Sequence, residues 1–157
     1  MKFESRYITV NEAKLYAELG GSGETIILLP GFTLDHRMFN YQKPLGDKYN
    51  LVMVDPRGFG YSSEIKKGEV YSHSEDISAV MNELGIEQAI VLGVSMGGKM
   101  AIDFAIDNKD RVKALIVASS GLGGTIYSSK LKRMVGMVLA KGRENGADGM
   151  KNAWLGQ

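Results

Sequence analysis

Short, continuously apolar runs recur along the first 118 residues. They lie at residues 25–29, 51–54, 89–92 and 114–118. Runs of this length, partly β-branched, are typical of strands buried on both faces, as in a parallel sheet covered by helices. Residues 3–10 and 13–19 alternate instead between apolar and polar positions, with Asn11-Glu12 between them. We interpret this start of the chain as a β-hairpin.

Between the apolar runs, apolar residues recur with the spacing of amphipathic helices. Over residues 73–84 apolar side chains recur every three or four positions, and Ser72 with Glu75 forms a capping-box pattern before them. Two more helices are expected, one capped by Asp35 and one over residues 96–107.

Strand and helix patterns alternate from residue 25 to residue 118, which predicts an α/β fold with a mostly parallel, doubly wound sheet. The pattern then changes. Residues 126–140 form an amphipathic helix pattern with Leu139 on its apolar side, a further helix is expected after Gly142, and no strand pattern follows. We therefore divide the chain into a sheet-forming core over residues 1–124 and a helical segment over residues 125–157.

Composition narrows the class of protein. The 157 residues are 44% hydrophobic and 24% charged, with a formal net charge of +1, as in an ordinary globular domain and unlike a nucleic-acid-binding protein. Cysteine is absent, so disulfides and thiolate metal sites are excluded. The charged start lacks a signal-peptide pattern, and no run approaches the roughly 18 apolar residues of a membrane span. We expect a cytoplasmic protein without a cofactor or bound metal, and without nucleic-acid or membrane partners.

The segment with the clearest chemical role is Gly93-Val94-Ser95-Met96-Gly97. It directly follows a predicted strand and directly precedes a predicted helix, which is the setting of a nucleophile elbow, where a serine sits in a strained turn. Small flanking residues are needed there, and Gly93 and Gly97 meet that need. The N-terminus of the following helix adds partial positive charge and free N–H groups for an oxyanion. The alternative is a serine that only caps the helix.

Two further segments resemble motifs of a known family. Leu29-Pro30-Gly31-Phe32-Thr33 ends one apolar run, and Asp55-Pro56-Arg57-Gly58-Phe59-Gly60-Tyr61-Ser62 follows the next. Together with the Ser95 motif, they resemble the α/β-hydrolase superfamily, especially its esterase, lactonase, perhydrolase and carbon–carbon hydrolase branch. The resemblance implies that Ser95 is the nucleophile and that the backbone N–H groups of Phe32 and Met96 form the oxyanion hole. Pro30 and Val94 stand where this family often has histidine.

The base that would activate Ser95 is not evident in the sequence. A serine hydroxyl needs such a base, and the family places an acid and a histidine after the nucleophile. The two histidines of this chain, His36 and His73, both precede Ser95. We consider His36 as an unconventional base, although a polar residue in the first turn of a surface helix is the plainer interpretation. His73 is expected to face solvent.

The resemblance also implies that the family's acid and histidine would lie beyond Gln157, and that residues 125–157 begin a helical cap over an incomplete core. Because the strand at residues 114–118 lacks a predicted neighbour on its outer side, we expect a homodimer or a higher oligomer through this edge and the cap helices.

These patterns predict a serine hydrolase acting on small carboxylic esters or lactones, impaired because the usual acid and histidine are missing. Haloalkane dehalogenases and epoxide hydrolases of the family carry aspartate at the position of Ser95. The alternative is a non-catalytic fragment of the fold that acts as a binding or assembly module. A third interpretation, a membrane-interface helix over residues 126–141, is less economical than a cap helix.

Overall fold

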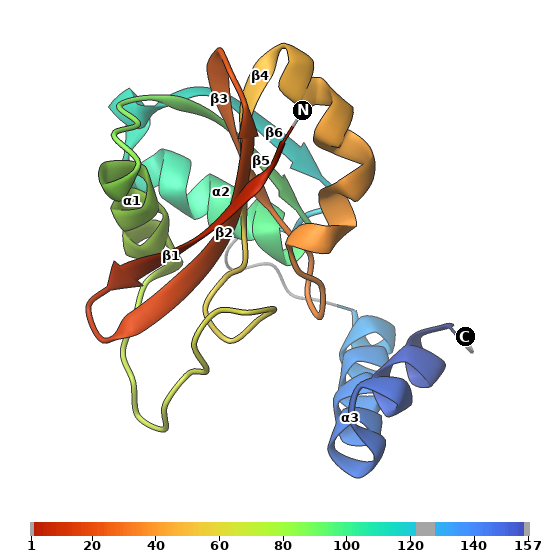
Figure 1. Cartoon of the computed structure of the whole chain (residues 1–157). Helices are drawn as coiled ribbons and strands as arrows, with labels where there is room; N and C mark the ends of the chain where they lie inside the picture. Colours follow the sequence, from red (N-terminus) through yellow and green to blue (C-terminus); the bar gives the residue numbers. More distant parts are fainter. Residues whose placement is uncertain (1, 122–127, 156–157) are drawn as a thin grey trace. The chain divides into compact units, whose positions relative to one another are not determined.

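A computed structural model describes residues 2–121 and 128–155. The chain divides into two compact units, Met1–Gly123 and Gly124–Gln157, and the division falls one residue from the boundary expected from the sequence. Sheet and surrounding helices belong to the first unit, and the helix α3 belongs to the second (Figure 1).

The first unit is built on a six-stranded sheet with the order β1-β2-β4-β3-β5-β6. Its strands are β1 (Glu4–Val10), β2 (Ala13–Gly21), β3 (Glu24–Leu29), β4 (Tyr49–Val54), β5 (Ala89–Val94) and β6 (Val112–Ala118). Strands β4, β3, β5 and β6 pair in parallel, whereas β1 with β2 and β2 with β4 pair antiparallel. This confirms the predicted hairpin and the mostly parallel sheet.

The helices of this unit begin close to the predicted positions. Ser72 caps α1 (His73–Glu83) by accepting the N–H of Glu75 at 3.5 Å, and α2 (Met96–Asp107) coincides with the predicted third helix. Asp35 caps η1 (His36–Asp47), which is a 3-10 helix that contains Pro44. A shorter 3-10 helix, η2 (Lys109–Arg111), precedes β6.

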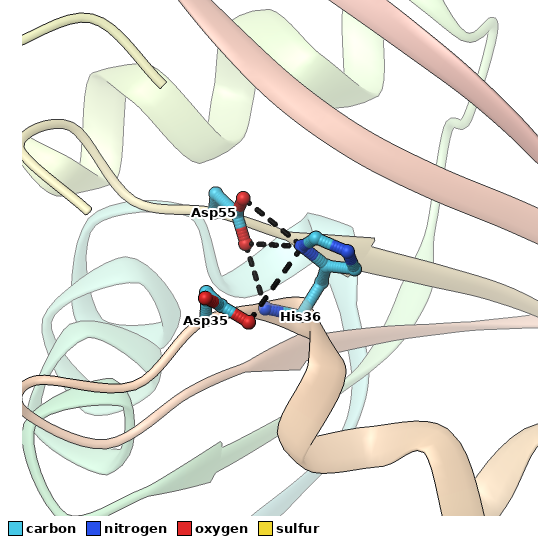
Figure 2. Close-up of side chains that lie close together, drawn as sticks. All are labelled: Asp35, His36 and Asp55. Atoms are coloured by element: carbon cyan, nitrogen blue, oxygen red, sulfur yellow. Dashed lines mark hydrogen bonds and ion pairs between the residues drawn. The ribbon is translucent and has the colours of Figure 1, made fainter. Parts of the chain in front are cut away.

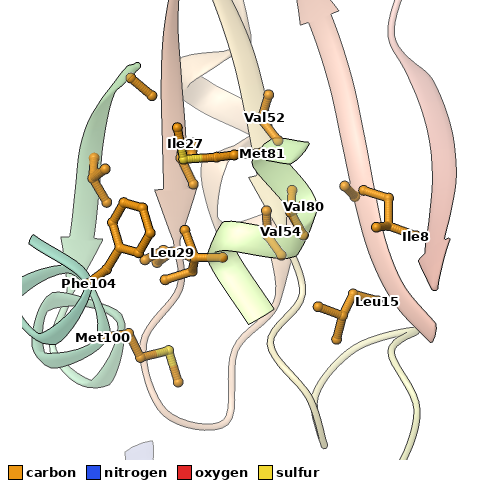
Figure 3. Packing of buried hydrophobic residues seen from close by; sticks show 14 of the residues in the cluster. Ile8, Leu15, Ile27, Leu29, Val52, Val54, Val80, Met81, Met100 and Phe104 are labelled. Carbon is orange, nitrogen blue, oxygen red and sulfur yellow. The ribbon is translucent and has the colours of Figure 1, made fainter. Parts of the chain in front are cut away.

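Apolar side chains cover both faces of the sheet, as a doubly wound fold requires. On one face, α1 and α2 pack on a large cluster that includes Val80, Met81 and Phe104 (Figure 3). On the other face, Phe39 of η1 joins a smaller cluster with side chains of β3 and β4. Because both faces of the central strands are covered, the loops at the carboxyl ends of these strands remain accessible.

The second unit consists of α3 (Ser129–Leu155), which is interrupted by non-helical backbone at Asn145 and Gly146. The expected break after Gly142 is therefore three residues too early: Gly142 lies within the helix, where an added Cβ would meet the side chain of Met150. Val138 and Leu139 both belong to the side of this helix that was expected to be apolar and buried; Val138 is buried, whereas Leu139 is exposed. The first two residues of the predicted helix, 126 and 127, lie outside the described part of the chain.

Two further observations bear on the surface. No helix among the described residues combines the length and apolarity needed to cross a membrane. Strand β6 forms one edge of the sheet, and its consecutive side chains Leu115, Ile116 and Val117 are 40–46% exposed. The outer edge and the apolar side chains of β6 are thus open in the described part of the chain.

Candidate active site

Ser95 occupies the sharp bend between β5 and α2. Its φ of 54° and ψ of −111° lie in a region that residues other than glycine rarely adopt. The Ser95 N–H donates to the carbonyl oxygen of Ala118 at 2.8 Å, and the Lys99 N–H donates to the Ser95 carbonyl at 3.1 Å. Ser95 is exposed. Strand β6 on one side and the first turn of α2 on the other therefore hold a strained, accessible serine.

Close backbone approach explains the glycines that flank Ser95. A Cβ added to Gly93 would collide with the carbonyl of Gly97, and one added to Gly97 would collide with the carbonyl of Leu29. Any side chain at either position would push α2 away from the ends of β3 and β5. The bend thus needs glycine at both positions for a steric reason that is independent of catalysis.

Residues 31–35, which we call the oxyanion loop, lie beside this bend. Strand β3 pairs with β5 so that Leu29 stands opposite Gly93, and both strands deliver their loops to the same edge of the sheet. A Cβ added to Gly31 would lie 3.7 Å from the Cβ of Ser95. The loop is bent tightly, since the Leu34 N–H donates to the Gly31 carbonyl at 3.1 Å and Thr33 has a φ of 67°.

The two expected oxyanion donors come from the segments that meet here. Phe32 belongs to the oxyanion loop, where its ring contacts Phe59 with centroids 6.0 Å apart. Met96 is the first residue of α2, and the N–H groups of a helix's first turn have no acceptor within the helix. The partial positive charge of this helix end adds to their effect on an anion. The pairing of β3 with β5 therefore brings the loop that contains Phe32 to the edge of the sheet where Met96 begins α2.

His36 is buried, so the interpretation of it as a surface residue is wrong. Only 5% of it is exposed, and its ring packs against Tyr16 and Tyr61. Its Nδ1 lies 2.9 and 3.0 Å from the two carboxylate oxygens of Asp55, which is fully buried (Figure 2). Because an ionised carboxylate only accepts hydrogen bonds, Nδ1 carries the hydrogen and donates it. Local sequence patterns missed this pair because the two residues are 19 positions apart.

A second buried pair links the segment after β4 to α1. Arg57 is 2% exposed and donates from Nη2 to Oδ1 of Asp76 at 2.6 Å and from Nε to Oδ2 at 3.2 Å. Its Nη1 donates to Glu69 at 2.5 Å. The hydrogen bond with Asp76, followed by the charges of both acids, holds the pKa of Arg57 above its usual value. Arg57 therefore belongs to the framework of the site.

His73 is half-buried, which corrects the expectation that it faces solvent. Its ring contacts that of Tyr71, with centroids 5.1 Å apart. Burial lowers the pKa of His73, partly offset by the nearby carboxylate of Asp76. Within residues 2–121 and 128–155, neither His73 nor His36 forms a hydrogen bond with the Ser95 hydroxyl.

Asp35, His36 and Asp55 have the spacing of metal ligands, with one ligand atom of each within 4.8 Å of the others (Figure 2). These atoms already have partners, however. The His36 ring donates to Asp55, and Arg37 donates to both oxygens of Asp35, which lowers the pKa of that carboxyl. A metal ion would have to replace these bonds, so we interpret the group as a hydrogen-bonded cluster.

Comparison with known proteins places this geometry in a family. The model of the alpha/beta hydrolase fold matches residues 24–145. The dihydrolipoyllysine-residue acetyltransferase component of the acetoin cleaving system of Cupriavidus necator is 38% identical over 117 residues, which are 72% of this chain and 31% of that protein.

Solved structures agree in fold. An esterase from Thermogutta terrifontis is 29% identical, with a TM-score of 0.74, and the match covers 91% of this chain and 54% of the esterase. A variant of the Vigna radiata epoxide hydrolase, 23% identical with a TM-score of 0.78, matches in fold over 93% of this chain and 52% of its own. The chain thus spans about a third to a half of the length of these relatives. With the family model matched over most of its residues, this chain belongs to the α/β-hydrolase fold family.

Proposed function

We propose that this chain supplies the nucleophile and the oxyanion hole of a serine hydrolase that acts on carboxylic esters or lactones. The observation that carries the proposal is the backbone of Ser95, with φ 54° and ψ −111°, in an exposed bend between β5 and α2. A serine that merely caps a helix needs no such strained geometry, because ordinary N-caps have extended backbone. Strain of this kind is concentrated at functional residues.

The chemistry follows from the groups around the bend. The Ser95 Oγ attacks the carbonyl carbon of the ester, and the electrons of the C=O bond move to the oxygen. The N–H groups of Phe32 and Met96 donate hydrogen bonds to that oxyanion, each worth roughly 3–4 kcal/mol of barrier in comparable sites. The Oγ proton must pass to a base, and His36 and His73 are the histidines in the sequence that could receive it.

A serine nucleophile favours carbonyl substrates over epoxides. The similarity to an epoxide hydrolase, at 23% identity, concerns the fold alone, and the esterase match, at 29% identity, covers a similar share of this chain, so the preference rests on the serine at position 95. Esters and lactones share the planar carbonyl that a serine can attack and the oxyanion that two backbone N–H groups can bind.

A binding or assembly module is the second candidate function. It is favoured by one observation, namely that neither histidine reaches the Ser95 hydroxyl in the described residues. Without a base, the Ser95 bend could still bind an anion at the N-terminus of α2, but turnover of an ester would be slow.

Labelling by a fluorophosphonate probe and turnover of p-nitrophenyl acetate and butyrate separate the two functions. We expect the chain to react with the probe and to hydrolyse the esters slowly, and we expect Ser95→Ala to abolish both. Turnover that survives in Ser95→Ala would remove Ser95 from the mechanism. A folded protein, judged by circular dichroism, that is inert in both assays would support the binding module.

The same assay identifies the base. Turnover by His36→Ala and His73→Ala is compared with that of the parent chain after each variant is shown to be folded. Loss in His73→Ala alone, with probe labelling also slowed, would point to His73 as the base. Loss in His36→Ala would show that His36 is needed, either as a base or to position the site, and equal turnover in all three would exclude both as bases.

A further inference from the structure

We infer that His36 and Asp55 are positioning residues that hold the oxyanion loop, residues 31–35, against the Ser95 bend. The inference rests on the proposed function, because it assigns to this pair the placement of the Phe32 N–H group. It gives His36 a role other than that of a base.

Asp55 bonds to three separate segments of the chain, two of them through its carboxylate. It accepts the backbone N–H of His36 at 2.6 Å, the His36 ring Nδ1–H at 2.9 Å and the backbone N–H of Tyr61 at 2.9 Å. Its own backbone N–H donates to Tyr16 on β2 at 2.9 Å. A fully buried carboxylate is costly unless it is bonded in this way. Asp55 therefore fixes the start of η1, and with it the end of the oxyanion loop, to the end of β4.

The loop has other contacts, since Phe32 packs on Phe59 and Arg37 donates to the Asp35 carboxylate, but Asp55 is what ties its end to the end of β4. It begins at the end of β3, which the sheet holds, and it ends at Asp35, directly before His36. Gly60 packs closely against both Asp55 and Asp35, because an added Cβ there would collide with the Asp55 carboxylate and would lie 2.9 Å from the Cβ of Asp35. A shift of His36 relative to Asp55 would therefore move the loop that carries Phe32.

The packing of the His36 ring argues for positioning and against proton transfer. The ring packs at a tilt against Tyr16, with centroids 4.7 Å apart, and against Tyr61, with centroids 5.6 Å apart. Its Nδ1–H donates to Asp55, so a base at this position would have to use Nε2, and neither ring nitrogen bonds the Ser95 hydroxyl among the described residues. Catalytic donors tolerate errors of only about 0.5 Å, and a misplacement of about 1 Å can cost roughly 100-fold in rate. A rigid, buried support of this kind supplies such accuracy.

Two substitutions of His36 distinguish the roles. In His36→Asn the new side-chain amide nitrogen can occupy the place of Nδ1 and donate to Asp55, whereas His36→Phe keeps an aromatic ring and removes the donor. If His36 positions the loop, His36→Asn should retain the fluorophosphonate labelling rate of Ser95 to within roughly threefold, and His36→Phe should lose roughly tenfold or more. If His36 is a base, both should lose equally, which would overturn the inference. Unchanged labelling in His36→Phe would also overturn it.

A control substitution in η1 tests whether any change in this helix alters the labelling rate. Lys43→Gln breaks the ion pair of Lys43 with Glu18, 2.9 Å long in the parent, and leaves Asp55 untouched. Its labelling rate should match that of the parent.

Hydrogen–deuterium exchange tests the inference even if Ser95 proves unreactive. We expect His36→Phe to raise amide exchange in residues 31–35 and 58–62, with β3 and β5 unchanged, and His36→Asn to restore protection. Exchange in residues 31–35 that stays at the parent rate in His36→Phe would overturn the inference, as would a uniform rise across the sheet, which indicates lost stability alone. Absence of probe labelling in the parent chain would reject the proposed function, while the exchange data would still decide the role of the pair.

Discussion

At the scale of single residues, the backbone of Ser95 stores strain at the position where the chemistry is proposed. The geometry at φ 54° and ψ −111° costs of the order of 1–3 kcal/mol for a residue with a Cβ and far less for glycine. We therefore expect Ser95→Gly to be more stable than Ser95→Ala by about 1 kcal/mol or more, measured by urea unfolding.

The control for this comparison lies on α2, where the backbone is helical. At Ala105, substitution by glycine should lower the free energy of unfolding by about 1 kcal/mol. If glycine destabilises the chain at both positions alike, Ser95 is not strained in solution.

His73 should make stability depend on pH. Burial lowers its pKa from the usual 6.5, so the folded chain binds the proton less tightly than the unfolded chain does. The free energy of unfolding contributed by neutral His73 is present above pH 6.5 and falls as the pH drops through 6.5 toward the lowered value.

Urea unfolding of the parent chain and of His73→Gln, between pH 7.5 and pH 5.5, checks this. The parent should lose more stability than His73→Gln over that interval. Equal losses would mean that His73 has the same proton affinity in both states.

At the scale of elements, the Arg57–Asp76 pair connects the segment after β4 to α1. Removing one partner of a buried pair leaves the other charge uncompensated, at a cost of roughly 3–5 kcal/mol. We expect Asp76→Ala to lower the free energy of unfolding by about that amount. The exposed pair between Lys99 and Asp103 offers the comparison, since Asp103→Ala should cost about 1 kcal/mol or less. If the two variants lose similar amounts of unfolding free energy, burial does not make the Arg57–Asp76 pair more important for stability than an exposed pair.

The elements that local patterns specify were the predictable part of the fold. The Ser72 cap sets the start of α1 within the sequence of its own first turn, and the apolar run before Gly93 is directly readable as β5. The glycines and Ser95 lie within five residues of one another, so the proposed elbow was visible without any tertiary information. The 3-10 form of η1 was not, although Pro44 removes one of its backbone donors.

Pairings between distant residues were beyond the sequence. The residues around His36 do not indicate that it pairs with Asp55 in the interior, because Asp55 follows β4 and is 19 residues away in sequence. Histidine is also more often partly exposed than fully buried. The antiparallel pairing of β2 with β4 likewise depends on how the hairpin meets the sheet. These are properties of tertiary packing, and they include the residues to which we assign the positioning role.

At the scale of the whole molecule, the open edge at β6 bears on whether copies of the chain associate in solution. The strand exposes Leu115, Ile116 and Val117, and its single charged residue, Lys113, is paired with Glu24 at 2.9 Å. Unprotected edges of this kind pair with other chains. We propose that the 157-residue chain forms a homodimer or higher oligomer through β6.

Size-exclusion chromatography with light scattering tests this at micromolar concentration. Ile116→Lys places a charge on the edge and should shift the chain toward monomer, whereas Val70→Lys, at a 98% exposed position that is not part of β6, should leave the mass unchanged. A monomeric parent chain would refute the proposal.

Because the sequence contains no cysteine, a single introduced thiol can be used to measure the electrostatic potential at the N-terminus of α2, next to Ser95. Ser95→Cys would carry the only thiol of the molecule, directly before the first turn of α2. A helix N-terminus stabilises thiolate over thiol, so the pKa of this group should lie below the usual value of about 8.5. The pKa, measured from the ultraviolet absorbance of the thiolate as a function of pH, would report how strongly this helix end stabilises a negative charge, without any substrate. A pKa at or above about 8.5 would mean that α2 offers that anion no help.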